Sequence, residues 1–351
     1  MIRKKWRDSL RVSRSAPLRV SWRARLLFTI LIALPFLVLN GIAFMQARSM
    51  THFVSVRQRT AKPEQLALID KIRVILTGVE IPRPKNQTTP QEIQLGYETH
   101  RIAIGQEGKE NLEAWYIPTQ KSRGLVLLFP PYGSSKAALL APTKVFHDLG
   151  YDALLVDFRG AGGSTGNDTT LGVREAKDVA IAFTYSQKQW ADKPMILYGA
   201  SMGAVAVMRA VAIEKIEPAA LILESPFDRL LNTVRHRFEV MGIPSFPSAE
   251  LIVFWGGVQQ GIDGFSHNPV DYARSIPCPV LLLHGERDQR VTVAEAAQIF
   301  ERLPGQKHWQ VFSSANGHGS LTADDTEQWQ DWVSRFLKSD RPTHKPGVIV
   351  E

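Results

Sequence analysis

Cysteine is nearly absent from this chain, and so are the sequence patterns that bind metals and nucleotides. Cys278 is the only cysteine in 351 residues, which excludes an intrachain disulfide framework and is compatible with either redox compartment. There is no His-Glu-x-x-His motif and no cysteine pair, so we expect no metal site. Residues 160–165 lack the third glycine of a dinucleotide fingerprint, and no lysine follows at the spacing of a phosphate-binding loop. We therefore expect no cofactor.

An excess of positive charge is also missing from most of the chain. The formal net charge is +8, but residues 1–25 alone hold nine basic residues and one acidic residue. The remaining residues carry no net charge, because they hold 33 of the 42 basic and 33 of the 34 acidic residues. This balance argues against a nucleic-acid-binding protein. We interpret residues 1–25 as a basic cytoplasmic tail, because a long apolar run follows directly.

That run, residues 26–45, contains 20 residues without a charge. A helix that rises about 1.5 Å per residue needs about 20 residues to cross a membrane, and Pro35 and Gly41 are tolerated in such a helix. We predict a single-pass membrane anchor, with the N-terminus in the cytoplasm and the catalytic domain on the opposite side (periplasmic, extracytoplasmic or lumenal). A signal peptide cleaved near Gly41 and Ala43 is the main alternative, and a buried core helix is the third.

Residues 46–96 are predicted to connect this anchor to the catalytic domain. Apolar residues at helical spacing predict a juxtamembrane helix over 64–78, and the polar residues 84–90 are predicted to form a linker. The catalytic domain is expected over 97–338, followed by a C-terminal tail over 339–351.

Short apolar runs and helical patterns alternate through this domain. After a predicted hairpin, buried strands and helices follow one another, which implies an α/β fold with a mostly parallel sheet and helices on both faces. The predicted hairpin strands are 99–104 and 112–117, the later strands include 124–129, 151–157, 219–224, 279–284 and 308–312, and the helices include 137–149, 172–190, 293–303 and 326–337.

One stretch, residues 228–267, interrupts the alternation. It is too long for an ordinary connection, carries helical patterns at 230–241 and 249–254, and is rich in apolar and aromatic residues. We predict a helical cap that shields an apolar pocket over the active site. The alternative is a structural insertion that only packs on the body.

The strongest chemical motif is Gly199-Ala200-Ser201-Met202-Gly203, which lies between an apolar strand and a helix of small residues. Gly-x-Ser-x-Gly in this context is a nucleophile elbow, a tight turn that projects the serine hydroxyl from the end of the sheet. We therefore predict Ser201 as the catalytic nucleophile. The alternative is an ordinary turn with an idle serine.

A serine nucleophile needs a base to accept its proton and an acid to orient that base. In folds with a nucleophile elbow, the acid follows the serine along the chain and the base follows the acid. Asp288 follows the predicted strand 279–284, and His318 lies in a glycine-flanked loop after the strand 308–312. Because sites in parallel sheets form at the carboxyl ends of the strands, we expect Ser201, Asp288 and His318 to converge as a catalytic triad.

These motifs resemble those of the α/β-hydrolase family over most of residues 97–338. The resemblance is narrower to its serine hydrolases, which include esterases, monoacylglycerol lipases, membrane-associated lipid hydrolases and serine aminopeptidases of the S33 type. It is carried by GASMG, by HGERDQRV, whose aspartate is Asp288, and by ANGHGS, whose histidine is His318. DFRGAGGSTG at 157–166 is similar to a family stretch that implies scaffolding rather than catalysis.

The reaction also needs hydrogen-bond donors for a tetrahedral oxyanion. One donor is expected to be the backbone N–H of Met202, the residue after the nucleophile. The family commonly supplies the second from a His-Gly loop, where this chain has Pro130-Pro131-Tyr132-Gly133. Proline has no N–H, and the position that matches the family's donor is Tyr132. The resemblance thus implies an oxyanion hole formed by Tyr132 and Met202, of altered shape.

Several assignments have alternatives. Glu286, Asp271 or Glu224 could supply the acid in place of Asp288, and the other candidate histidines, His284, His236 and His267, are predicted to be structural.

We predict a membrane-anchored serine hydrolase that cleaves lipid-like or medium-chain acyl esters through an acyl-enzyme on Ser201. Its partners would be a small-molecule acyl substrate and, through residues 26–45, the membrane. A serine peptidase or aminopeptidase on the same fold is the enzymatic alternative, because acyl transfer to water uses the same groups. A non-catalytic membrane scaffold is the alternative from another class, and only the proline-altered loop favours it.

Overall fold

The computed structural model describes residues 21–55, 60–61, 67–105 and 108–339. Most of the predicted basic tail 1–25, nearly all of the predicted tail 339–351 and the first part of the predicted helix 64–78 lie outside the described residues. The chain falls into two compact units, divided between Gly41 and Ile42. The second unit contains the sheet and every residue predicted to be catalytic.

The second unit is built on an eight-stranded sheet with the order β1-β2-β4-β3-β5-β6-β7-β8. Strand β2 is antiparallel to both of its neighbours, and all pairings from β4 to β8 are parallel. The strands are β1 (Glu98–Ile104), β2 (Glu110–Ile117), β3 (Leu125–Phe129), β4 (Asp152–Val156), β5 (Met195–Ala200), β6 (Ala220–Glu224), β7 (Val280–Gly285) and β8 (Lys307–Phe312). The predicted hairpin and the predicted parallel strands are confirmed.

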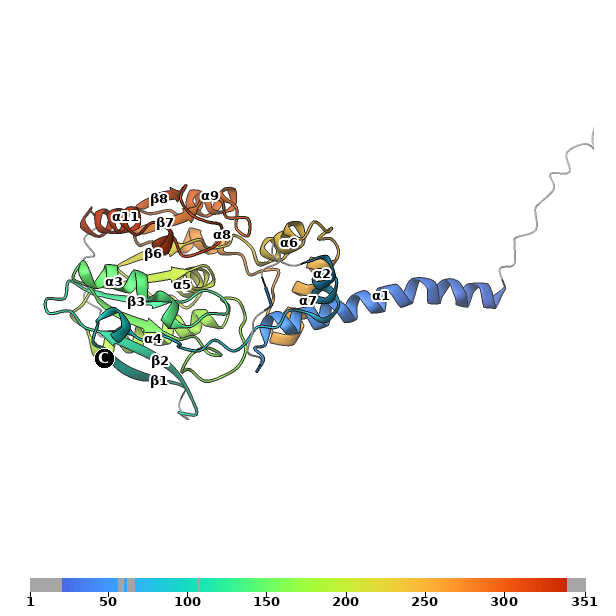
Figure 1. Cartoon of the computed structure of the whole chain (residues 1–351), viewed down its shortest axis with the longest axis horizontal. Helices are drawn as coiled ribbons and strands as arrows, with labels where there is room; N and C mark the ends of the chain where they lie inside the picture. The colour runs from blue at the N-terminus through green and yellow to red at the C-terminus, as the bar shows by residue number, and fades with distance from the viewer. Residues whose placement is uncertain (1–20, 56–59, 62–66, 106–107, 340–351) are drawn as a thin grey trace, which may run out of the picture. The chain divides into compact units, whose positions relative to one another are not determined.

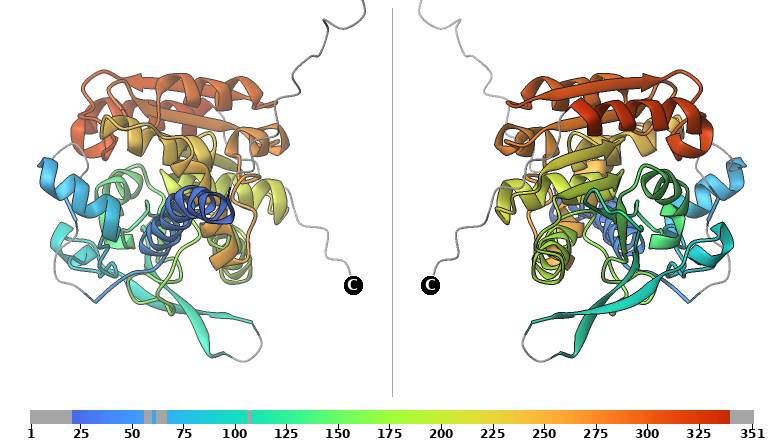
Figure 2. Two further views of the ribbon diagram at one scale, coloured as in Figure 1. Left: turned by 90° about the vertical axis from the view of Figure 1, so that its right-hand side faces the viewer. Right: turned by 90° about the vertical axis from the view of Figure 1, so that its left-hand side faces the viewer.

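Helices cover both faces of this sheet (Figures 1 and 2). Side chains of β3 alternate between two apolar cores: Leu127 packs in the core with α4 (Glu175–Gln189), α5 (Met202–Ile213) and α9 (Val293–Arg302). Val126 and Leu128 pack in the other, with α3 (Leu140–Asp148) and α11 (Thr326–Ser339). Because both faces are covered, β3 and β4 are buried at every position, and Asp152 is their one residue that is not apolar. The shorter elements are η2 (Pro90–Ile93), η3 (Lys136–Leu139), α8 (Pro269–Tyr272), η4 (Ala273–Ser275) and α10 (Leu321–Asp324).

The insertion predicted over 228–267 contains two helices, α6 (Leu230–Val240) and α7 (Ser248–Gln260). Helix α7 continues well past the predicted end at residue 254 and ends at Gly261, whose φ of 64° is left-handed. The two helices form a third apolar core, which also includes Ala43 and Ala47. Residues from near the start of the chain therefore complete the packing of the insertion.

Helix α1 (Trp22–Thr51) is longer at both ends than the predicted span and continues through Pro35. Its stretch Arg25–Thr51 is, within the described part of the chain, the one helix long and apolar enough to cross a membrane. After α1, the chain stays attached to the body: the N–H of Thr169 donates to the carbonyl of Thr51 at 2.8 Å. The last ten residues of α1 thus belong to the second unit.

The segment predicted as a juxtamembrane helix and linker is also attached to the body. It contains α2 (Leu68–Thr77), inside the predicted range. Further on, the guanidinium of Arg83 donates to the carbonyls of Gly162 and Ser164 at 2.9 and 2.6 Å. The amide of Asn86 donates to Asp157 at 2.8 Å. Polar residues that look like a linker in the sequence are therefore hydrogen-bonded to the loop after β4.

Candidate active site

Ser201 occupies a strained turn between β5 and α5. Its φ of 52° and ψ of −114° are unfavourable for a residue with a side chain. The flanking glycines allow this turn, because a Cβ on Gly199 would lie 2.5 Å from the backbone of Gly203 and Ala204. A Cβ on Gly203 would lie 2.2 Å from the carbonyl oxygen of Phe129. The glycines therefore let strand, turn and helix approach closely, as the elbow motif predicts.

The structure brings the three predicted triad residues together. Ser201 Oγ lies 2.9 Å from His318 Nε2, and His318 Nδ1 lies 2.6 Å from Asp288 Oδ2. Ser201 follows β5, Asp288 follows β7, and His318 follows β8, so parallel strand ends meet at one edge of the sheet. With Asp288 ionised, Nδ1–H donates to the carboxylate and leaves Nε2 free to accept the serine proton.

The Asp288 carboxylate is fully buried, and both of its oxygens accept hydrogen bonds. Its Oδ1 accepts hydrogen bonds from the N–H groups of Arg290 and Val291 at 2.9 and 3.0 Å. Burial by itself raises the pKa of Asp288, but the hydrogen bond and charge of His318 and the two backbone donors outweigh it. The pKa of Asp288 therefore lies below its usual value. The group is held as an anion beside the imidazole.

The other acid candidates occupy different places. Glu224, at the end of β6, is buried and accepts hydrogen bonds from Tyr198, Leu321 and Trp329 at 2.8, 3.0 and 3.1 Å. Burial raises its pKa above the usual value despite these donors. Its bond to the N–H of Leu321 holds the loop that carries His318. Asp271 pairs with Arg302 at 2.7 Å, and Glu286 is exposed.

The other candidate histidines are bound to backbone groups away from Ser201. His284 Nε2 lies 3.0 Å from the carbonyl of Val291, and burial lowers its pKa. His236 Nδ1 lies 3.0 Å from the carbonyl of Arg290. His267 is fully buried, and burial lowers its pKa to about 4. These positions are consistent with structural roles.

The predicted oxyanion donors lie on α5 and on the loop after β3. Met202 is the first residue of α5, so its N–H has no acceptor within the helix. The carbonyls of Phe129 and Pro130 approach Gly203 closely, which places the start of the loop against the start of α5. The hydroxyl of Tyr132 donates to the carbonyl of Met50 at 2.5 Å. This bond links the loop to the last turn of α1, a contact that the sequence does not reveal.

A buried ion cluster holds the other end of this loop. Lys136 Nζ is completely buried and lies 2.5 Å from Asp157 and 2.9 Å from Glu113. The N–H of Lys136 also donates to Asp157, at 2.7 Å. Asp157 begins the stretch 157–166, which the family resemblance marks as scaffolding. This resemblance was the one feature of the sequence that pointed to the ion cluster. Lys136 and Glu113 carry no motif and were missed.

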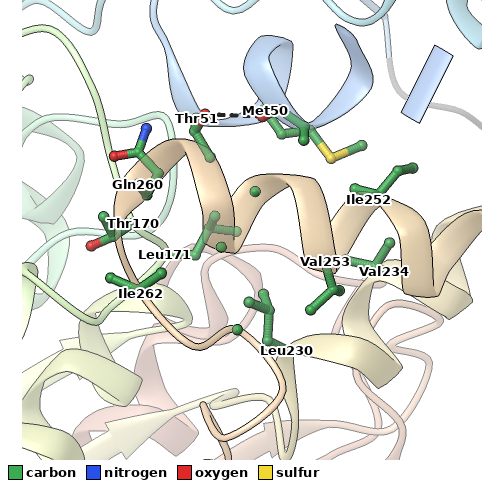
Figure 3. Close-up of a pocket in the computed structure, with 14 residues that line it drawn as sticks. Met50, Thr51, Thr170, Leu171, Leu230, Val234, Ile252, Val253, Gln260 and Ile262 are labelled. Atoms are coloured by element: carbon green, nitrogen blue, oxygen red, sulfur yellow. Dashed lines mark hydrogen bonds between the residues drawn. The ribbon is translucent and has the colours of Figure 1, made fainter. Parts of the chain in front are cut away.

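An apolar cavity lies between the insertion 228–267 and the end of α1 (Figure 3). Leu171 lines it and packs in the same cluster as Val205, one helical turn after Ser201. Its walls are formed by Ala47, Met50, Thr51, Thr170, Leu171, Leu230, Val234, Ile252, Val253, Gly256, Gly257, Gln260, Ile262 and Gly264. Among the described residues, no group of three His, Cys, Asp or Glu side chains could hold a metal ion.

The sheet order, the elbow and a match to a family model define the class of protein. The model described as serine aminopeptidase, S33, matches residues 120–246. A solved esterase of Pyrococcus furiosus superposes with a TM-score of 0.62 at 25% identity, over 74% of this chain and 96% of that one. The chain belongs to the α/β-hydrolase superfamily and is a serine hydrolase by this relationship.

Among curated proteins, the chain is similar to lysophosphatidylserine lipases. The lysophosphatidylserine lipase ABHD12 of Danio rerio is 25% identical over 299 residues, 75% of this chain and 74% of that protein. The Gallus gallus protein of the same name is 32% identical over 149 residues, 41% of this chain and 38% of that protein. The second match thus spans less than half of its relative's length. The similarity to lipases and esterases is distant.

Proposed function

We propose that this protein hydrolyses acyl esters through an acyl-enzyme on Ser201. The observation that carries the proposal is the chain of hydrogen bonds from Ser201 through His318 to Asp288, with distances of 2.9 and 2.6 Å. A serine hydroxyl is a poor nucleophile without such a base. A buried anion at Asp288 stabilises the imidazolium that forms when His318 accepts a proton.

The reaction proceeds in two halves. Ser201 Oγ attacks the acyl carbonyl while its proton passes to His318 Nε2, and the tetrahedral intermediate collapses as His318 returns the proton to the leaving alcohol. Water then attacks the acyl-enzyme and gives a proton to His318. The second tetrahedral intermediate collapses as His318 returns this proton to Ser201 Oγ, which breaks the ester bond and releases the carboxylic acid. In both halves, the N–H groups of Met202 and Tyr132 stabilise the oxyanion.

The substrate that we propose is a lipid-like or medium-chain ester. The apolar cavity supports this class, because aliphatic side chains line it and one of them, Leu171, packs in the same apolar cluster as Val205 of α5. The names of the similar lipases support it as well. We further propose that residues 26–45 anchor the protein in a membrane, with the N-terminus in the cytoplasm, and that residues 228–267 act as the cap.

The substrate class is tested with p-nitrophenyl esters from acetate to palmitate and the full chain in detergent. Val253→Phe narrows the cavity from α7, so the chain-length optimum is expected to shift to shorter esters while acetate hydrolysis is unchanged. Val258→Phe is the matched control, because Val258 is exposed on the same helix. An optimum that stays in place in Val253→Phe would mean that the acyl chain binds elsewhere.

A peptidase is a second candidate, since the matching family model is described as serine aminopeptidase. An aminoacyl amide series measured beside the esters separates the two. A kcat/KM for amides above that for esters would favour the peptidase.

A further inference from the structure

We propose that α2, together with the exposed end of α1 and the outer side of α7, lies in the interface of a lipid bilayer and takes up anionic headgroups. This proposal rests on the proposed membrane anchor and adds a second membrane-binding element to it. We name this surface, formed by Phe44, Met45, Leu68, Ile69, Ile72, Leu76, Phe254 and Val258, the interfacial patch.

Helix α2 presents an apolar face without a partner in the described structure. None of its residues is buried, and Leu68 and Ile69 are 75% and 73% exposed, with Ile72 and Leu76 about half exposed. At 100° per residue, Leu68, Ile72 and Leu76 form one stripe along the helix. A helix of this kind would not leave its apolar stripe in water, and a membrane interface is a surface that it fits.

Helix α2 is attached to residues that directly follow the proposed anchor in the chain. The side-chain amide of Gln46 donates to the carbonyls of Val74 and Ile75, the latter at 2.7 Å. The N–H of Val79, just after α2, donates to Ser49 at 3.2 Å. Gln46 directly follows the charge-free run 26–45. If that run spans the hydrocarbon core, α2 is held at the level where the core meets the headgroups.

Exposed apolar residues continue from α2 across α1 to α7. Phe44 and Met45 are 41% and 46% exposed on α1. The ring of Phe44 contacts Trp255 with centroids 5.5 Å apart, and Gln259 donates to the carbonyl of Phe44 at 2.8 Å. These contacts place the exposed Phe254 and Val258 beside α1. Helices α2 and α7 flank the last ten residues of α1 (Figures 1 and 2), so the patch lies around the end of α1.

Charged residues beside the patch indicate which lipids it fits. Arg73 and Arg48 are exposed, on α2 and on the last turn of α1, and Lys71 also lies on α2. Cations at headgroup level attract anionic lipids. Helix α7 carries the patch on its outer side and the apolar cavity on its inner side. A lipid ester would thus leave the bilayer next to the cavity.

The patch is tested on the full chain reconstituted into vesicles that contain phosphatidylserine. In a Cys278→Ser background, an environment-sensitive fluorophore is placed on Ile72→Cys and, as the matched control, on Asp70→Cys. Asp70 is two residues away and about 160° around the helix from Ile72. The Ile72 label is expected to shift to the blue and to be quenched by nitroxide lipids, and the Asp70 label to be quenched by aqueous iodide. Equal iodide quenching at both positions would overturn the proposal.

Activity gives an independent readout. Ile72→Glu with Leu76→Glu is expected to raise the apparent KM for an ester embedded in vesicles several-fold and to leave p-nitrophenyl acetate hydrolysis unchanged. Ile213→Glu, on the exposed side of α5, is the control. Unchanged vesicle kinetics in the double variant would contradict the patch.

The failures can be told apart. A full chain that carbonate washing removes from the vesicles contradicts the anchor and the patch. If the full chain stays on the vesicles but the label at position 72 is accessible to water, the result contradicts the patch and not the anchor. Absence of acetate hydrolysis by the wild type contradicts the proposed chemistry.

Discussion

The triad region and the cap region of the hydrolase unit are held by opposite kinds of contact. Around the triad, buried polar groups are bound by several donors, as at Asp288 and Glu224. In the cap region, formed by the predicted cap 228–267 and residues 42–51 of α1, aliphatic side chains pack together, and large apolar side chains of α7 and of the attached helix α2 are exposed. Directional bonds fix reacting atoms, whereas apolar packing shapes a surface for hydrophobic molecules. The proposed chemistry and the proposed substrate class therefore rest on different parts of the fold.

The largest effect on activity is expected when the carboxylate of the predicted triad is replaced by an amide. Asp288→Asn removes the anion that orients His318, and kcat is expected to fall by about 10⁴-fold, as in other serine hydrolases with this change. Glu224→Gln keeps one acceptor oxygen for the donors around it but leaves the Ser201–His318–Asp288 hydrogen bonds in place, and should lower kcat by less than about tenfold. Steady-state kinetics on p-nitrophenyl butyrate compares the two variants. The reverse ranking would show that Glu224 is the catalytic acid.

A substitution in the buried ion cluster should affect stability more than any exposed pair. Asp157→Asn leaves Lys136 with one buried carboxylate in place of two, and we expect a loss of about 3–5 kcal/mol in the free energy of unfolding. Asp148→Asn breaks an exposed pair with Lys144 and should cost less than about 1 kcal/mol. Urea unfolding of the full chain in detergent measures both. Equal costs would mean that the cluster does not hold the loop after β3.

His267 lies at the end of the stretch 228–267, and its titration should weaken the protein in acid. Its Nε2 donates to the carbonyl of Leu171, on the cavity wall, at 3.1 Å. The folded pKa is about 4 and the usual value is 6.5, so between these values the unfolded chain binds more protons. Stability contributed by neutral His267 is therefore present above pH 6.5 and falls by up to about 3 kcal/mol toward pH 4.

The check is the slope of unfolding free energy against pH in this range, for wild type and for His267→Gln. The variant is expected to have a lower free energy of unfolding than the wild type at pH 7. Its free energy of unfolding is expected to fall less than that of the wild type as the pH is lowered. Parallel slopes would assign the acid sensitivity to other groups.

The smallest effect is expected at the contact between the oxyanion loop and α1. Tyr132→Phe keeps the backbone N–H but removes the hydrogen bond to Met50, which is worth about 1 kcal/mol. We expect a roughly fivefold lower kcat with little change in KM. Tyr185→Phe, which removes a hydroxyl contact to His100 at 2.8 Å, is the control. A kcat equal to that of the wild type would show that α1 does not position the loop.

The fold was predictable because apolar strands and the helical patterns alternate along the chain. The convergence of Ser201, Asp288 and His318 was predictable because parallel strands end at one edge of the sheet. In contrast, Gln46 binding α2, Tyr132 binding Met50 and Arg83 binding the loop after β4 join segments distant in sequence. Such contacts depend on three-dimensional packing and follow no local pattern, which explains why residues 46–96 read as a connection.

The most direct test of the proposed catalytic role of Ser201 is fluorophosphonate labelling of the full chain, with wild type beside Ser201→Ala and Ser225→Ala. Ser225 is a suitable control, because it also has a positive φ and follows a neighbouring strand. Wild type and Ser225→Ala are predicted to take up label, and Ser201→Ala to take up none. A folded wild type without label, or an equally labelled Ser201→Ala, would contradict a nucleophile at Ser201.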